Sequence, residues 1–118
     1  MIEYQTINGT KIGTVPFSNG TSLTNDTLLD VMMNCRFEDC GSILVYQHHL
    51  ADEFFDLKTK VAGDLLQKFS TYDCKLAIVG NFQSIESKSL ADFIGESNRI
   101  GRITFASTKE EAIKALSV

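Results

Sequence analysis

Ile43-Leu44-Val45-Tyr46 is the stretch that decides the fold, because four apolar residues follow one another without a polar residue between them. A strand with one face in water alternates apolar and polar residues, so an unbroken apolar run predicts a strand covered on both faces. Leu76-Ala77-Ile78-Val79-Gly80 shows the same pattern, and Ile103-Thr104-Phe105-Ala106 is the last strand we expect. The sequence therefore predicts three strands side by side, sandwiched between helices.

Segments with helical periodicity separate these strands. The clearest is 56–69, in which apolar residues recur at every fourth position: Leu57, Val61, Leu65 and Phe69. This spacing predicts one amphipathic helix over the whole segment. Gly63 lies inside it and costs about 1 kcal/mol relative to alanine. We therefore expect Gly63 to allow the close approach of another backbone, either within the fold or at a subunit contact.

Capping residues mark where the other helices begin. Thr24 or Asn25 is expected to cap one helix, and Gly101 to end a later one. Ser89 and Thr108 each stand three residues before an acidic side chain, which is the spacing of a capping box. Three helices are thus predicted in addition to the one at 56–69.

A hairpin is expected ahead of these elements. Ile2–Gln5 and Lys11–Val15 alternate in polarity, and Asn8-Gly9 between them accepts positive φ at both turn positions. Pro16 ends the second strand because it lacks a backbone donor. Strands that alternate with helices imply parallel pairing. We therefore expect a single α/β domain over residues 1–118, with a mixed five-stranded sheet, an N-terminal hairpin, a parallel centre and about four helices.

Charge and composition exclude several classes of partner. The chain of 118 residues carries a net charge of −4 and has no cluster of Lys and Arg, which argues against nucleic acid and against an anionic membrane surface. No apolar run approaches the ~20 residues that cross a bilayer, and Met1-Ile2-Glu3 does not open a signal peptide. Three cysteines cannot all pair within one chain, so we expect reduced thiols and a cytoplasmic protein.

Three stretches resemble the bacterial family named domain of unknown function 4180. They are the segments 54–69, 76–80 and 87–99, and the resemblance extends over nearly the whole chain. The family has no established activity to transfer, so this resemblance implies a family without implying a function.

The element order also resembles that of STAS domains, which are regulatory, non-catalytic modules with a phosphorylatable Ser or Thr at the start of a helix. The corresponding stretch here lacks the usual Asp-Ser-Ser/Thr-Gly pattern, since lysines flank its threonine. The resemblance implies a protein partner or a homodimer, and phosphorylation of the threonine. The binding surface it implies consists of Asp56, Lys58, Thr59, Lys60 and Gly63.

The alternative is a small-molecule or anion site, with enzymatic chemistry left open, beyond the carboxyl ends of the parallel strands. The residues expected at this rim are Gln47, His48, Asn81, Ser87 and Ser89. A simpler interpretation is that these residues cap helices and fill loops. A flat rim filled by Phe54 and Phe82 would contradict the site.

No catalytic, cofactor or metal residues are predicted. Cys35, Cys40 and the histidine pair form a poor zinc set, because structural sites use more closely spaced ligands. His48 and His49 would point to opposite faces if the strand continued through them.

Overall fold

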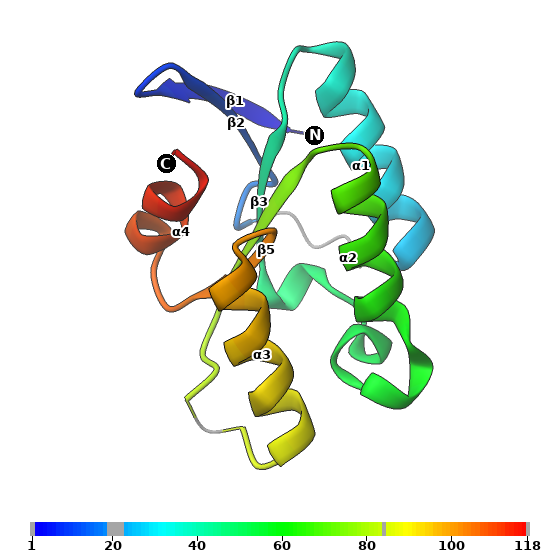
Figure 1. Ribbon diagram of the computed structural model, residues 1–118. Coiled ribbons are helices and arrows are strands. Elements are labelled where there is room, and N and C mark those ends of the chain that lie inside the picture. The colour runs from blue at the N-terminus through cyan, green and yellow to red at the C-terminus, as the bar shows by residue number, and fades with distance from the viewer. Residues whose placement is uncertain (1, 19–22, 84, 118) are drawn as a thin grey trace.

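The parallel strands form the centre of the molecule. The computed structural model describes residues 2–18, 23–83 and 85–117. Its sheet has five strands in the order β1-β2-β3-β4-β5, with β1 antiparallel to β2 and every other pair parallel. The strands are β1 (Glu3–Ile7), β2 (Thr10–Thr14), β3 (Ser42–Tyr46), β4 (Lys75–Val79) and β5 (Ile103–Ala106). The predicted α/β class and mixed five-stranded sheet are therefore confirmed (Figure 1).

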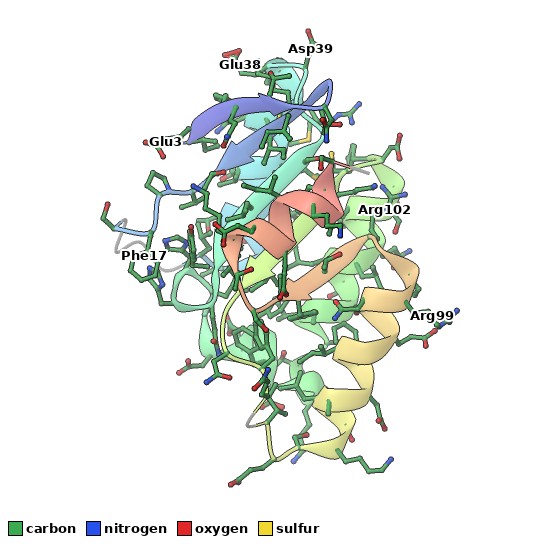
Figure 2. All side chains as sticks on the ribbon, turned by 90° about the vertical axis from the view of Figure 1, so that its left-hand side faces the viewer. Glu3, Phe17, Glu38, Asp39, Arg99 and Arg102 are labelled. Atoms are coloured by element: carbon green, nitrogen blue, oxygen red, sulfur yellow. The ribbon has the colours of Figure 1, made fainter. Side chains whose placement is uncertain are left out.

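Four helices in the described part of the chain cover this sheet unequally. They are α1 (Asn25–Phe37), α2 (Val61–Thr71), α3 (Lys88–Ile100) and α4 (Lys109–Leu116). The parallel strands follow one another in spatial order, and right-handed crossovers between such strands place their connecting helices on one face. Accordingly α1, α2 and α3 share one apolar cluster, whereas α4 packs into a second cluster on the other face (Figures 1 and 2).

The alternation of side chains explains why β3 and β4 are apolar after their first residues, Ser42 and Lys75. Ile43 and Val45 lie in the cluster under α1 to α3, while Leu44 between them lies in the cluster under α4. Leu76 and Ala77 divide between the two clusters in the same way on β4. Both faces of these strands are dry, so both require apolar side chains.

The N-terminal hairpin is confirmed. Asn8 (φ 50°) and Gly9 (φ 80°) form the turn, and Ile7 pairs with Thr10 across it. Both turn positions are left-handed, which only a few residue types accept at low cost.

The prediction of one helix over 56–69 is wrong at its start. Leu57–Thr59 is a separate 3₁₀ turn, Lys60 has left-handed backbone at φ 63°, and α2 begins at Val61. A left-handed residue cannot continue a right-handed helix. The apolar residues keep the same spacing on both sides of Lys60, so the spacing alone does not show that the helix begins only after it.

The three other helix starts were predicted with different success. Ser87, not Ser89, caps α3, because Ser87 Oγ accepts from the Leu90 amide at 3.2 Å. Thr24, one of the two residues expected to cap α1, does so, and Thr108 caps α4 as expected. Gly101 ends α3 with left-handed backbone.

Gly63 does not allow the close approach within the fold that was expected of it. A Cβ atom added at this exposed position would meet nothing within 4 Å. Within the described residues, packing therefore gives no reason for glycine here.

No helix in the described part of the chain combines the length and the apolar character needed to span a bilayer.

Because α4 covers one face of the sheet, shortening a buried side chain of this helix should lower the free energy of unfolding substantially. Leu116 is 3% exposed and packs in the cluster that contains Ile12 and Leu44. Leu116→Ala should lower the free energy of unfolding by about 2–4 kcal/mol, because it leaves a cavity beneath α4. Urea denaturation followed by circular dichroism measures this. The control is Ile100→Ala, since Ile100 is 55% exposed; an equal loss in both variants would contradict the role of α4.

Candidate functional site

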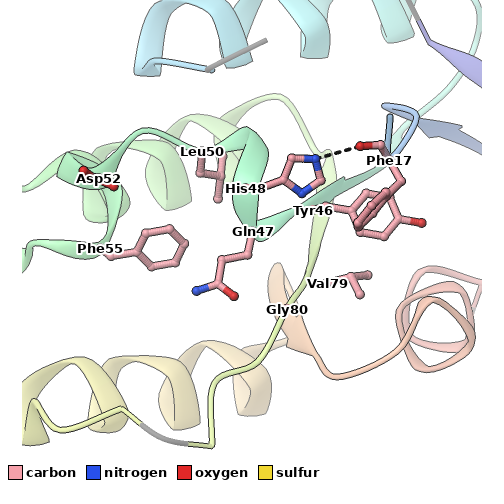
Figure 3. A pocket seen from close by; sticks show the side chains of 9 residues that line it. All are labelled: Phe17, Tyr46, Gln47, His48, Leu50, Asp52, Phe55, Val79 and Gly80. Atoms are coloured by element: carbon pink, nitrogen blue, oxygen red, sulfur yellow. Dashed lines mark hydrogen bonds between the residues drawn. The ribbon is translucent and has the colours of Figure 1, made fainter. Parts of the chain in front are cut away.

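The chain leaves the carboxyl ends of β3 and β4 around a hollow of about 540 Å³. A 3₁₀ turn, Gln47–His49, follows β3, and Gly80 follows β4. We call this space the rim hollow (Figure 3). Its lining residues are Phe17, Tyr46, Gln47, His48, Leu50, Asp52, Phe55, Val79 and Gly80. The sheet edge at which a site was predicted is therefore hollowed.

The orientation of the Gln47 amide is fixed by its neighbours. The backbone N–H of Asn81 donates to Gln47 Oε1 at 3.1 Å. An N–H group requires an oxygen acceptor, so this bond settles which end of the amide faces β4. The Nε2 group, with two donor hydrogens, is left on the opposite side and points toward Phe55 in Figure 3.

Gly80 makes room for this arrangement. A Cβ atom at Gly80 would lie 2.6 Å from Gln47 Cβ, closer than real Cβ atoms approach a neighbour. The glycine therefore allows β4 to pass directly beneath Gln47, and the position of the Gln47 side chain depends on it.

His48 lies on the rim hollow with a defined proton position. Its Nε2 is 2.8 Å from the backbone carbonyl oxygen of Phe17, and a carbonyl only accepts, so Nε2 carries the hydrogen. In the neutral ring this leaves Nδ1 as an acceptor. The ring also contacts Phe17 edge-on, with centroids 4.7 Å apart, which holds the imidazole in place (Figure 3).

The two histidines do not lie on opposite faces of a strand, because β3 ends before them. The 3₁₀ turn brings their ring centroids to 4.2 Å. His49 is buried, and its Nδ1 accepts from the Tyr46 amide at 3.0 Å. His48 is exposed and lines the hollow, whereas His49 is not among its lining residues.

Aromatic rings form the walls of the rim hollow. Phe17 is 66% exposed and packs edge-on against Tyr46, with centroids 5.0 Å apart. Phe55 lies on the other side. Phe17 therefore presents an apolar ring surface both to solvent and to the hollow.

The rim is not the flat surface, filled by Phe54 and Phe82, that would contradict a site there. Phe54 is buried in the core, and its ring centroid lies 6.3 Å from that of Phe105. Phe82 packs edge-on against Phe105 at 5.1 Å. Neither residue lines the hollow, and the space above β3 and β4 stays open.

The other predicted rim residues are divided. Asn81 contributes its backbone amide, while its Oδ1 accepts from the Gln83 amide at 3.3 Å. Ser87 and Ser89 lie in a neighbouring hollow of about 510 Å³. Its other lining residues are Phe55, Asp56 and Lys58. The predicted rim residues thus border two neighbouring hollows that share Phe55, and the second contains residues from both predicted sites.

The stretch from Asp56 to Gly63 has two different parts. Thr59 Oγ1 lies 2.6 Å from Glu53 O and 2.7 Å from Asp56 O, and it accepts from the Val61 amide at 3.3 Å. Asp56 and Thr59 therefore hold the turn that precedes α2. Lys58, Lys60 and Gly63 are exposed.

Sequence reasoning missed several residues of the rim hollow, among them Phe17, Tyr46, Asp52 and Phe55. Phe17 and Tyr46 follow or end parallel strands, so the rule that ligands gather at the carboxyl edge could have found them. Asp52 and Phe55 lie in a 3₁₀ turn, Asp52–Phe55, for which the sequence gives no comparable signal.

The cysteines and histidines that were considered as zinc ligands are separated in space. Cys35 and Cys40 lie at the end of α1, whereas the histidines follow β3 at its carboxyl end. Within the described ranges, no three His, Cys, Asp or Glu side chains gather in a way that could hold a metal ion.

The comparisons with known proteins give one match. A family model described as a domain of unknown function, DUF4180, matches residues 7–116. No curated protein and no solved structure matches the chain. The resemblance found in the sequence is thereby confirmed, and the resemblance to STAS domains receives no support.

The contact between Gly80 and Gln47 predicts a steric penalty at the hollow. Gly80→Ala should displace the Gln47 side chain, break its bond to Asn81 and cost about 1–3 kcal/mol of stability through overpacking. Amide hydrogen exchange at Asn81 and urea denaturation measure the two effects. Gly41→Ala is the control, because its nearest neighbour would lie at 3.7 Å. Unchanged exchange at Asn81 in Gly80→Ala would show that Gln47 is not held as described.

Proposed function

We propose that this chain, which belongs to the DUF4180 family of domains of unknown function, binds a planar heteroaromatic molecule bearing an amino group in the rim hollow. The observation that carries the proposal is the fixed amide of Gln47. Its Oε1 is taken by the Asn81 amide, so its Nε2 donors are presented to a ligand in a defined direction. Small-molecule sites typically combine an apolar cavity with a few oriented polar groups of this kind.

The walls support a flat, apolar ligand body. Phe17, Tyr46 and Phe55 present aromatic rings to the hollow, and Leu50 and Val79 add aliphatic surface. Aromatic rings pack favourably by stacking or edge-on contact. The volume of about 540 Å³ suits a molecule of one or two rings.

The polar groups support an amino-substituted edge. Gln47 Nε2 offers donors, while the Asp52 carboxylate and, when the imidazole is neutral, His48 Nδ1 offer acceptors. A ring nitrogen beside an amino group supplies the matching acceptor and donors. The Asp52 charge disfavours an anionic ligand, because two negative charges in contact repel each other. This pattern supports amino-substituted rings over carboxylated ones.

Adenine and 2-aminopyridine are suitable probes for this proposal, and benzoate is the matched anionic control. Titration of the ¹⁵N-labelled protein should shift the amides of Gln47, Gly80 and Asn81 with either amine, and much less with benzoate. Gln47→Ala should weaken binding by about tenfold or more, since an oriented hydrogen bond in a partly buried site is worth about 1–2 kcal/mol.

The control variant is Gln83→Ala, an exposed glutamine on the segment that follows β4. It should bind the amines as the unchanged protein does. Equal affinity of Gln47→Ala and Gln83→Ala, or equal shifts with benzoate, would overturn the proposal.

A second candidate function is association with a protein partner or a second copy through the surface of Lys58, Lys60 and Gly63. The observation that favours it is Gly63 itself, a helical glycine with open space around its Cα. A regulatory role with phosphorylation of Thr59 belongs to the same candidate. A phosphate on Thr59 would remove the hydrogen bonds that hold the turn before α2.

Gly63 provides the test of this surface. Gly63→Ala should raise the free energy of unfolding by up to about 1 kcal/mol, because alanine favours a helix and the space is open. Gly95→Ala is the matched control on α3, where an added Cβ also meets nothing within 4 Å.

In sedimentation and pull-down assays, Gly63→Glu should abolish association while Gly95→Glu leaves it intact. Association unchanged in Gly63→Glu would remove the candidate.

A further inference from the structure

A pair of buried thiols lies at the other end of the sheet from the rim hollow. We call Cys35 and Cys40 the thiol pair. Cys35 is in the last turn of α1, and Cys40 stands two residues before β3. Cys35 is fully buried and Cys40 is 2% exposed. The proposed ligand site uses neither residue.

The end of α1 brings the two cysteines together. The Cys40 amide donates to Cys35 O at 2.8 Å, the Asp39 amide donates to Arg36 O at 3.1 Å, and Asp39 is left-handed at φ 55°. These bonds form a Schellman motif, in which the side chains at the positions of Cys35 and Cys40 contact each other. Covalent dimensions and the 2.8 Å bond keep their Cα atoms within about 7 Å, near the range that a disulfide requires.

The surroundings of the two thiols give them different pKa values. Cys35 lies within hydrogen-bonding reach of the Tyr4 hydroxyl and of the Cys40 thiol. The Cys40 sulfur also lies 3.3 Å from Lys11 O and 3.1 Å from Ser42 O. The hydrogen bond with Cys35 lowers the pKa of Cys40, against the opposing effect of burial, and the Lys11 charge adds to the lowering. The same bond raises the pKa of Cys35. Cys40 is therefore the thiol of the pair that loses its proton first.

The N-terminal hairpin is the cover over the sulfur atoms. A Cβ atom at Gly13 would lie 2.9 Å from Cys35 Sγ and 3.3 Å from Tyr4 Cε1, so glycine on β2 makes the space in which they meet. Tyr4 is 38% exposed and belongs to β1, an edge strand that pairs only with β2 in the described sheet. Edge elements open locally at lower cost than central ones. Opening of β1 takes Tyr4 away from the Cys35 sulfur.

We propose that the thiol pair is an oxidation site, which forms a Cys35–Cys40 disulfide when a hydroperoxide reaches it through local opening of β1.

The chemistry balances without a further reactant. The Cys40 thiolate attacks one peroxide oxygen, the O–O bond breaks, and hydroxide leaves with the Cys40 proton as water, giving a sulfenic acid. Cys35 then attacks the Cys40 sulfur, the S–O bond breaks, and hydroxide leaves with the Cys35 proton as a second water. The two thiols lose two electrons, which reduce hydrogen peroxide to two molecules of water.

Cys74 is an internal control for this proposal. It follows α2 in the same motif, with its amide donating to Phe69 O at 2.8 Å and Asp73 left-handed at φ 53°. It is fully buried as well. The residue at the position of Cys35 is here Phe69, so the motif supplies Cys74 with an aromatic neighbour in place of a thiol. The same burial and backbone thus exist with and without a paired cysteine.

Trypsin separates all three cysteines, because Arg36 lies between the members of the pair. The folded protein is treated with hydrogen peroxide, denatured, alkylated and digested without reduction. The expected product joins peptides 12–36 and 37–58, which carry Cys35 and Cys40, while peptide 69–75 carries alkylated Cys74. Alkylation of all three cysteines, or a link that includes Cys74, would overturn the proposal.

Tyr4→Ala tests the route of access. Removing the cover should speed formation of the Cys35–Cys40 link by about five- to tenfold, because the open form of an edge becomes more populated. The control is Tyr72→Ala, since Tyr72 is 41% exposed and lies at the end of α2, away from β1. Equal rates in Tyr4→Ala and the unchanged protein would overturn access through β1, and Cys40→Ser should abolish the link altogether.

Discussion

The structure depends on keeping both faces of β3 and β4 out of water. Parallel strands in sequential order send their connecting helices to one face, so α1, α2 and α3 cannot cover the other. In the described part of the chain the helix on that second face is α4, which has eight residues. Its buried Ala112 and Leu116 meet Leu44 and Ala77 from the sheet. The small side chains of Ala77, Ala106 and Ala112 allow so short a helix to approach closely, which a bulkier set would prevent.

The sequential order of the parallel strands also determines where a binding site can form. Each parallel strand ends at the same edge, and the segments that leave it toward the helices diverge, so a space opens between the turn after β3 and the chain after β4. Gly80 and Gln47 show how closely β4 has to approach the turn after β3. The strand must pass close beneath the turn for Asn81 to reach the Gln47 amide, and only glycine permits that distance. A side chain that seems to belong to a loop is thereby positioned by the central sheet.

The parts of the fold predicted from sequence are those with a strong local signal. The buried runs at 43–46 and 76–79, the turn at Asn8-Gly9 and the caps at Thr24 and Thr108 all follow from local patterning, and all are present. The start of α2 was missed because apolar periodicity is the same on both sides of the left-handed Lys60. Of the predicted rim, Gln47 and His48 could be placed because they follow a strand directly. Asp52 and Phe55 could not, since their approach to the hollow is set by a 3₁₀ turn and by tertiary packing.

The way in which α1 and α2 end determines which residues lie at the amino edge of the sheet. At the amino edge α1 and α2 both end on a left-handed aspartate followed by a buried cysteine. A β-branched residue is costly at a left-handed position, whereas aspartate accepts it, and the next residue must be small and apolar to turn under the helix into the strand. Cysteine meets that requirement, so the packing of each site is explained by structure alone. What structure alone does not require is a second thiol beside Cys40, because Phe69 fills the equivalent place beside Cys74. The asymmetry between two otherwise equal helix ends is therefore the feature from which a chemical role for Cys35 can be argued.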